Sequence, residues 1–175
     1  MFLFYAPILP TFAAKHPVTM SNFDILSPAE LAQLSEVPVQ IVALIGSADG
    51  AFDSEEQDWS DRMVNVFTYA QPKLINDFYE PVSQGFIDKV KALLAALPGE
   101  AAAREAALES KLQQVNPLLA KLDQELAAAL YKSFRTLAQE TAKASGGFLR
   151  IGAVGSAESR WIELPMITPI HPPAH

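Results

Sequence analysis

Hydrophobic residues recur at every third or fourth position along most of the chain, and this pattern predicts an all-α fold. Residues spaced in this way lie on one side of an α-helix. The second half of the chain shows the pattern most clearly, and its stripe predicts a helix long enough to span a bundle. Such a stripe is more often core than a dimer zipper, and the mixed charges beside it predict a solvated outer face. The stripe consists of Leu119, Leu122, Leu126, Leu130, Phe134 and Leu137.

Two helices are expected where the patterned region begins. Ser27-Pro28-Ala29-Glu30 has the sequence of a capping box with proline at the first helical position, so a short helix should run from there to about Glu36. Pro38 then opens a second helix that is almost entirely apolar up to Ala48. A helix without a polar side is expected to be buried on most sides.

Proline and glycine divide the rest of the chain into further helices. An amphipathic helix is expected from about Ser54 to Ala70, because its large apolar residues fall on one side. The residues rich in Ala, Leu, Glu and Lys between 100 and 145 are strong helix formers. The other expected helices run over about 73–80, about 86–97, two parts of 100–145 divided near Asn116-Pro117, and a last segment that ends near Leu164 before Pro165.

A short motif occurs twice and indicates an internal duplication. Ala48-Asp49-Gly50-Ala51-Phe52 matches Ala144-Ser145-Gly146-Gly147-Phe148, and each copy is followed by Glu-x-x-Trp. The second copy inserts six residues between its Phe and its Glu. Two helix–loop–helix units packed about a pseudo-twofold axis would bring the two loops together. The sequence therefore predicts a helical bundle with a pseudo-twofold repeat of helix–loop–helix units.

The first copy of the motif carries the acidic residues that suggest a binding site. Glu56 projects toward the apolar side of its helix, where an ionised carboxylate is costly unless it is hydrogen-bonded or bound to a metal. Free N–H groups of the preceding loop could satisfy it. The alternative is a divalent cation held by Asp49, Asp53 and Glu56, because hard cations favour clustered oxygen ligands, although the spacing is not that of an EF-hand. Glu158, the matching acid of the second copy, is the fourth candidate ligand.

Composition narrows the classes of function. A chain of 175 residues can bury a core of its own, and residues 20–164 are expected to form one helical domain. The formal charge of −7 and the lack of a basic patch disfavour binding to nucleic acid or to an anionic membrane. The absence of cysteine excludes disulfides and thiolate metal sites. The sequence contains no apolar run of 18 residues, so we expect no transmembrane helix.

Both ends of the chain are rich in proline. Residues 1–19 are expected to form an irregular N-terminal arm or an extension of the reading frame before Met20, rather than a signal peptide for export. Residues 165–175 are expected to form a proline-rich tail without regular structure, and we place disorder there first. His171 and His175 have the spacing of metal ligands on a helix, but the two prolines between them argue against a helix.

The first loop and its helix resemble the tellurite-resistance TerB-like family. The resemblance rests on Asp49, Gly50 and Glu56 in an Ala- and Leu-rich helical chain, with Glu158 as the second acid. It implies an all-α bundle of about seven helices with pseudo-symmetry. It also implies a cytoplasmic or membrane-associated role in stress response and acidic loop residues that bind a metal. Ser145, the six-residue insertion and the proline-rich ends depart from the family pattern.

The leading hypothesis is a non-enzymatic TerB-like interaction module that docks onto other proteins. A divalent metal of unknown identity at the acidic loop would be its cofactor, and we expect no catalytic residues. The alternative is a metal-dependent enzyme that uses clustered carboxylates. Against it, the three histidines lie outside the expected bundle and no Glu-x-x-His pair exists for a di-iron site. A third hypothesis, an exported helical binding protein, rests on residues 1–19 alone. We expect a cytoplasmic protein, and the oligomeric state is unknown.

Overall fold

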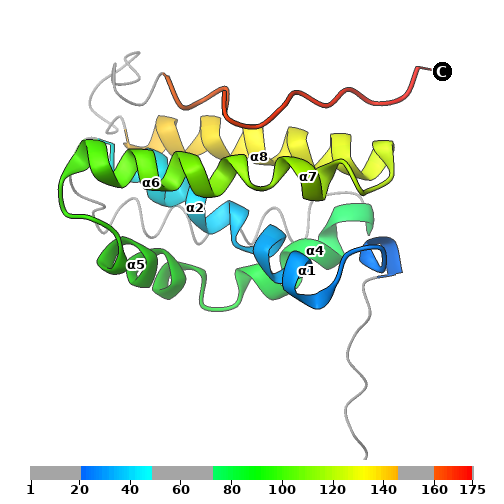
Figure 1. Cartoon of the computed structure of the whole chain (residues 1–175), viewed down its shortest axis with the longest axis horizontal. Helices are drawn as coiled ribbons and strands as arrows, with labels where there is room; N and C mark the ends of the chain where they lie inside the picture. The colour runs from blue at the N-terminus through cyan, green and yellow to red at the C-terminus, as the bar shows by residue number, and fades with distance from the viewer. Residues whose placement is uncertain (1–20, 49–72, 146–159, 175) are drawn as a thin grey trace, which may run out of the picture.

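The computed structural model describes residues 21–48, 73–145 and 160–174, and within these ranges all regular secondary structure is helical and no strand is present. The all-α prediction is therefore confirmed. The helices surround one core cluster to which all of them contribute (Figure 1). They are the 3-10 helix η1 (Ser21–Phe23), followed by α1 (Pro28–Ser35), α2 (Val37–Gly46), α4 (Lys73–Ser83), α5 (Phe86–Ala96), α6 (Ala101–Gln113), α7 (Asn116–Leu119) and α8 (Gln124–Ser145).

The predicted capping box begins α1. The Glu30 N–H donates to Ser27 Oγ at 3.3 Å, and the Ser27 N–H donates to Glu30 Oε2 at 2.9 Å. Pro28 follows the cap at a position where its missing N–H costs nothing. The sequence thus determines this helix start through contacts between neighbouring residues.

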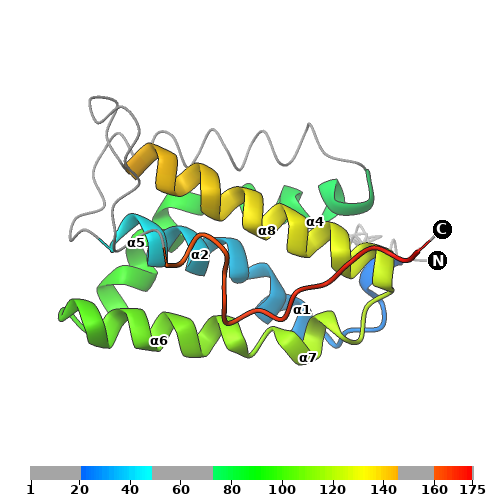
Figure 2. The same cartoon turned by 90° about the horizontal axis from the view of Figure 1, so that it is seen from above.

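Helix α2 lies at the centre of the fold, where every residue from Val37 to Gly46 is buried. It packs mainly against α8 and on its other sides against α5 and α6 (Figure 2). The apolar composition explains this place, since no side of α2 presents a polar surface to water. The stretch Pro28–Gly46 is long and apolar enough to cross a membrane, but a core helix of a soluble protein can have the same length and composition. In this fold, 61% of its apolar window is buried. The absence of a transmembrane helix stays a prediction.

The long apolar stripe is interrupted where a continuous helix was expected. Leu126, Leu130, Phe134 and Leu137 are buried on α8 as predicted, but Leu119 ends α7 and Leu122 lies in the connection. Asp123 starts the new helix, because its Oδ1 accepts from the Glu125 N–H at 2.9 Å. Leu119 and Leu122 are buried nevertheless, so the core stripe survives the break in the helix.

Pro81 lies inside α4, although we expected it to end the helix near Glu80. Only Val82 and Ser83 follow it, so its missing N–H interrupts no more than the last turn. The Lys89 ammonium donates to the carbonyl groups of Pro81 and Val82, at 3.4 Å each. Gly85, with a φ of 61°, then turns the chain into α5.

Residues 160–174, here called the C-terminal strap, lie over the side of the fold formed by α6, α7 and α8 (Figures 1 and 2). The helix expected to end near Leu164 is not found in the described part, because Arg160–Glu163 forms turns and Leu164 has a φ of 48°. The remainder lacks regular structure, as predicted. Disorder was the wrong expectation for it, because Leu164, Met166 and Ile167 are buried in the common core.

The N-terminal arm, the helix expected over Ser54–Ala70 and the Asp-Gly-containing loop lie outside the described residues, as does most of the second copy of the motif. The described helices support the all-α class but neither the count of about seven nor the pseudo-twofold repeat. Both finer statements therefore stay predictions.

Candidate functional site

The four predicted metal ligands, Asp49, Asp53, Glu56 and Glu158, all lie outside the described residues. The structure therefore neither brings them together nor separates them. Within residues 21–48, 73–145 and 160–174, no group of three or more His, Asp or Glu side chains could hold a metal ion. A candidate site within the described part must be built from other residues.

The described structure includes Ser47, which lies at the end of α2 and shortly before the acidic loop in the sequence. Arg104 of α6 donates through Nη2 to the Ser47 carbonyl at 3.1 Å and through Nε to Ser47 Oγ at 3.2 Å. Its Nη1 donates to the Gly99 carbonyl at 3.1 Å. Carbonyl groups at the end of a helix lack partners within the helix, and a cation there is favoured by the helix dipole. Arg104 thus fixes the C-terminal end of α2.

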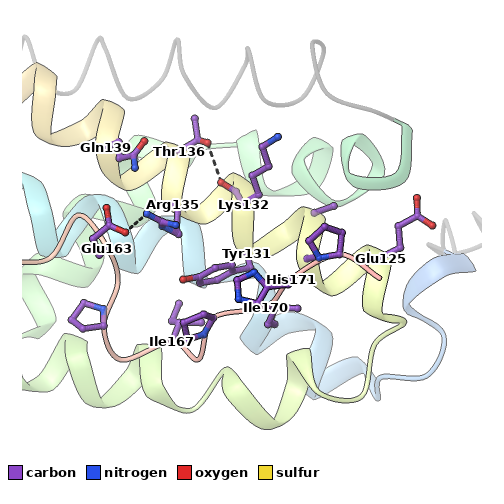
Figure 3. Close-up of a pocket in the computed structure, with 15 residues that line it drawn as sticks. Glu125, Tyr131, Lys132, Arg135, Thr136, Gln139, Glu163, Ile167, Ile170 and His171 are labelled. Atoms are coloured by element: carbon purple, nitrogen blue, oxygen red, sulfur yellow. Dashed lines mark hydrogen bonds and ion pairs between the residues drawn. The ribbon is translucent and has the colours of Figure 1, made fainter. Parts of the chain in front are cut away.

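A groove of about 830 Å³ runs between α8 and the C-terminal strap, and we call it the α8 groove (Figure 3). One wall is a single stripe of α8, and the other wall is the strap. The α8 wall consists of Glu125, Ala128, Ala129, Tyr131, Lys132, Arg135, Thr136 and Gln139, and the strap wall of Glu163, Pro165, Ile167, Pro169, Ile170, His171 and Pro172.

The helical period of α8 produces the first wall. Residues at Glu125, Ala129, Lys132, Thr136 and Gln139 follow one another at intervals of three or four, so they share one side of the helix. The core stripe of α8 occupies another side and packs on α2. The groove therefore uses the part of α8 that the core leaves uncovered.

Side chains of the helices hold the strap by its backbone. The Asn116 amide donates to the Met166 carbonyl at 2.9 Å and accepts from the Thr168 N–H at 2.7 Å. The Gln124 amide donates to the His171 carbonyl at 3.1 Å. An extended segment without a helix or sheet has no internal partners for its backbone, so these amides replace them. The strap is thereby fixed as the second wall of the groove.

The start of the strap is anchored by a charged and aromatic cluster. The Arg160 guanidinium lies 4.2 Å from the centroid of the Trp161 ring and donates to Glu105 of α6 at 2.5 Å. Trp161 itself is buried. These contacts, with the buried Leu164, fix the position from which the strap enters the groove region.

Arg135 is the main charged group inside the α8 groove. Its guanidinium pairs with Glu163 of the strap and lies 5.9 Å from the centroid of the Tyr131 ring (Figure 3). Its Nε–H is buried and has no acceptor in the described part of the chain. Among the described residues, one contact to Glu163 leaves most of the five guanidinium N–H donors without a charged partner.

The opposite side of the strap faces a second hollow, of about 460 Å³, beside α7. Ile170 lines both hollows. The second hollow is lined by Asn116, Pro117, Leu119, Ala120, Leu122, Gln124, Ala127, Thr168 and Ile170, a set without a charged side chain. The strap thus fills only part of the surface between α7 and α8.

Sequence reasoning did not identify the α8 groove. His171 was considered only as a metal ligand, and it forms part of the groove wall. His175 lies outside the described residues. The available signal was the second stripe of α8, in which small and polar residues alternate at helical spacing beside the leucines. From the sequence alone, that stripe predicts a solvated face of the helix. Its role as a groove wall depends on the strap, whose position the sequence pattern does not indicate.

Comparison with known proteins adds no identification to this geometry. No family model, curated protein or solved structure matches the chain. The resemblance to the TerB-like family accordingly stays a prediction that rests on Asp49, Gly50, Glu56 and Glu158.

Proposed function

We propose that this chain is a non-enzymatic binding module whose ligand site is the α8 groove. The observation that supports the proposal is a concave surface of about 830 Å³ with two walls held in fixed positions. Small-molecule sites in proteins commonly have volumes of about 300–1,000 Å³, an apolar lining and a few polar groups. The α8 groove has such a lining, with alanine, proline and isoleucine side chains and a small number of charged ones.

The polar groups of the groove suit binding better than catalysis. The Thr136 hydroxyl donates to the Lys132 carbonyl of its own helix at 3.0 Å, so its proton is bonded to a backbone group. The Glu163 carboxylate is paired with Arg135. These groups can orient a ligand through hydrogen bonds and charge.

The proposal is tested with Nile red, an uncharged apolar dye whose fluorescence rises on leaving water. The full chain should bind the dye, and Ala129→Trp should weaken binding by about tenfold or more, because the indole would occupy part of the groove. Ala106→Trp is the matched control, since Ala106 is exposed on α6 and distant from the groove lining. Equal dye binding by the two variants would reject the α8 groove as the site.

We propose as a second function that the acidic loop holds a divalent metal, in a TerB-like module with a pseudo-twofold repeat that serves stress response by docking onto other proteins in the cytoplasm. The motif at Asp49, Gly50 and Glu56 supports this proposal. A second support is that Arg104 binds the Ser47 carbonyl and so fixes the end of α2, which precedes the loop in the sequence. A site attached to a rigid element loses less entropy when it binds.

The metal proposal is tested by the melting temperature of the chelated protein with Ca²⁺, Mg²⁺, Mn²⁺ or Zn²⁺ added singly. An ion that binds only the folded state raises the melting temperature by mass action. The rise should disappear in Glu56→Gln and persist in Glu109→Gln, a change at an exposed position of α6. No rise with any ion would reject a metal at the loop and favour Glu56 as a structural cap.

A further inference from the structure

We infer that Ile170 determines which ligands fit the α8 groove, because its side chain separates the groove from the second hollow beside α7. The ligand class that suits both spaces is a linear, uncharged and apolar molecule. This inference rests on the proposed binding function of the groove. It adds a residue that selects ligands by length and the space into which a longer ligand would extend.

Ile170 is the residue that the two hollows share. Within the described part of the chain, the α8 groove of about 830 Å³ and the second hollow of about 460 Å³ have no other lining residue in common. Ile170 lies on the strap beside His171 (Figure 3), and its side chain is half-buried against the core cluster. It therefore occupies the space between the strap and the helices, where the two hollows meet.

The backbone on both sides of Ile170 is restrained. Pro169 comes directly before it and Pro172 follows His171, so proline rings restrict the chain on either side. The Gln124 amide of α8 also donates to the His171 carbonyl at 3.1 Å. These restraints oppose movement of the strap into a gap beneath it. A truncated side chain at Ile170 should therefore leave an opening between the two hollows.

The second hollow suits an apolar part of a ligand. Leu119 and Leu122 contribute to its lining, and no charged residue of the described chain does. Asn116 also lines it, but its amide already bonds to the Met166 carbonyl and the Thr168 N–H of the strap. A ligand that entered from the α8 groove would gain affinity there through the removal of apolar surface from water.

The α8 groove has apolar residues along both of its walls. Ala128 and Ala129 belong to the α8 wall, and Pro165, Ile167 and Pro169 belong to the strap wall. A linear apolar molecule can contact these side chains along its length. Each added methylene that leaves water should increase its affinity about fourfold. Methylenes that would have to enter the second hollow add nothing while Ile170 blocks the way.

The inference is tested by displacement of Nile red from the full chain with 1-hexanol, 1-octanol, 1-decanol and 1-dodecanol. Ile170→Ala should bind 1-dodecanol about tenfold more tightly than the wild type, because the longer chain reaches the opened second hollow. It should bind 1-hexanol no more tightly, since the shorter chain stays within the groove. Ile25→Ala is the matched control, since Ile25 is 65% exposed and lines neither hollow.

A second change identifies the space that the longer alcohol enters. Ala120 is exposed and lines the second hollow but not the α8 groove. Ala120→Phe should remove the gain for 1-dodecanol when it is combined with Ile170→Ala, because the phenyl ring would fill the second hollow. On its own, Ala120→Phe should leave the binding of every alcohol unchanged, since Ile170 then still separates the two spaces.

Equal binding of 1-dodecanol by the wild type, Ile25→Ala and Ile170→Ala would overturn the inference. A gain that persists in the double variant would also overturn it, as would a gain with faster amide hydrogen exchange at Thr168, because the strap itself would then have moved. Any of these results, with Nile red binding weakened by Ala129→Trp alone, leaves the groove as a site without this role for Ile170. Equal dye binding by Ala129→Trp and Ala106→Trp rejects the proposed function instead.

Discussion

Asn116 and Thr168 are 52 residues apart in the sequence, yet the Asn116 Oδ1 accepts a hydrogen bond from the Thr168 N–H at 2.7 Å. The same amide donates through Nδ2 to the Met166 carbonyl at 2.9 Å. One side chain therefore pairs with a donor and an acceptor of the extended strap, as a neighbouring strand would. This arrangement determines where the strap lies, and with it the second wall of the α8 groove.

Removal of this amide should loosen the strap. Asn116→Ala leaves the Thr168 N–H and the Met166 carbonyl without their partners, and the expected loss in unfolding free energy is about 1–3 kcal/mol. Chemical denaturation measures it. Amide hydrogen exchange at Thr168 should also accelerate. Gln114→Ala, an exposed change two residues earlier, is the control, and an equal loss in both variants would contradict the role of Asn116.

Arg104 should stabilise the fold through the end of α2. Arg104→Lys keeps the charge but cannot reach the Ser47 carbonyl, the Ser47 hydroxyl and the Gly99 carbonyl together, because lysine lacks the planar fork. The expected loss is about 1–2 kcal/mol in unfolding free energy. Lys111→Arg, on the exposed side of the same helix, should change stability little. A loss in Arg104→Lys no larger than that in the control would reject this role.

Glu30 should make stability depend on acid pH. The hydrogen bond from Lys121 is the largest influence and, with the backbone N–H and the hydroxyl of Ser27, it lowers the pKa of Glu30 to about 2. A lowered pKa stabilises the folded state above the pKa of the unfolded chain, which is about 4.3, and the stabilisation is lost as the pH falls toward 2.

The Glu30 prediction is measured by denaturation of the wild type and Glu30→Gln between pH 5 and pH 2. Glutamine preserves the capping geometry but does not titrate, so the variant should lose less stability over this range. Lys121→Met should raise the pKa of Glu30 in an NMR titration. Parallel pH profiles for the wild type and Glu30→Gln would contradict the prediction.

Tyr79 should make stability depend on alkaline pH. Its hydroxyl lies 2.9 Å from Ser133 Oγ in the core, a pair in which either oxygen can be the donor. Burial raises the pKa of Tyr79 well above its ordinary value, although the bond to Ser133 opposes the shift. A raised pKa means that stability is complete below about pH 10, the pKa of an exposed tyrosine, and declines above it.

The absorbance of ionised tyrosine and the unfolding free energy, followed together from pH 9 upward, measure this effect. Tyr79→Phe should lose less stability than the wild type over that range, because phenylalanine cannot ionise. Tyr131→Phe is the comparison, since Tyr131 lines the α8 groove. Ionisation of all tyrosines before any loss of stability would contradict the prediction.

The sequence by itself determined the parts of this protein that depend on neighbouring residues. The capping box of Ser27 and Glu30, the buried α2 and the core side of α8 follow from contacts within about one turn of helix and from the apolar period. Even there, the end of α4 was misplaced, because Pro81 lies in the last turn, where its missing N–H costs little and Lys89 donates to the terminal carbonyls of Pro81 and Val82.

Only the tertiary structure decided the course of the strap and the groove beside it. Trp161, Leu164 and Ile167 are buried because helices distant in sequence provide a surface for them, and no local pattern distinguishes such a strap from a free proline-rich tail. The polar side of α8 is likewise a wall of the groove only because the strap lies opposite it. Local sequence encodes helix starts and periods, whereas a site between segments requires contacts such as that of Asn116 with Thr168, which exist only in the folded chain.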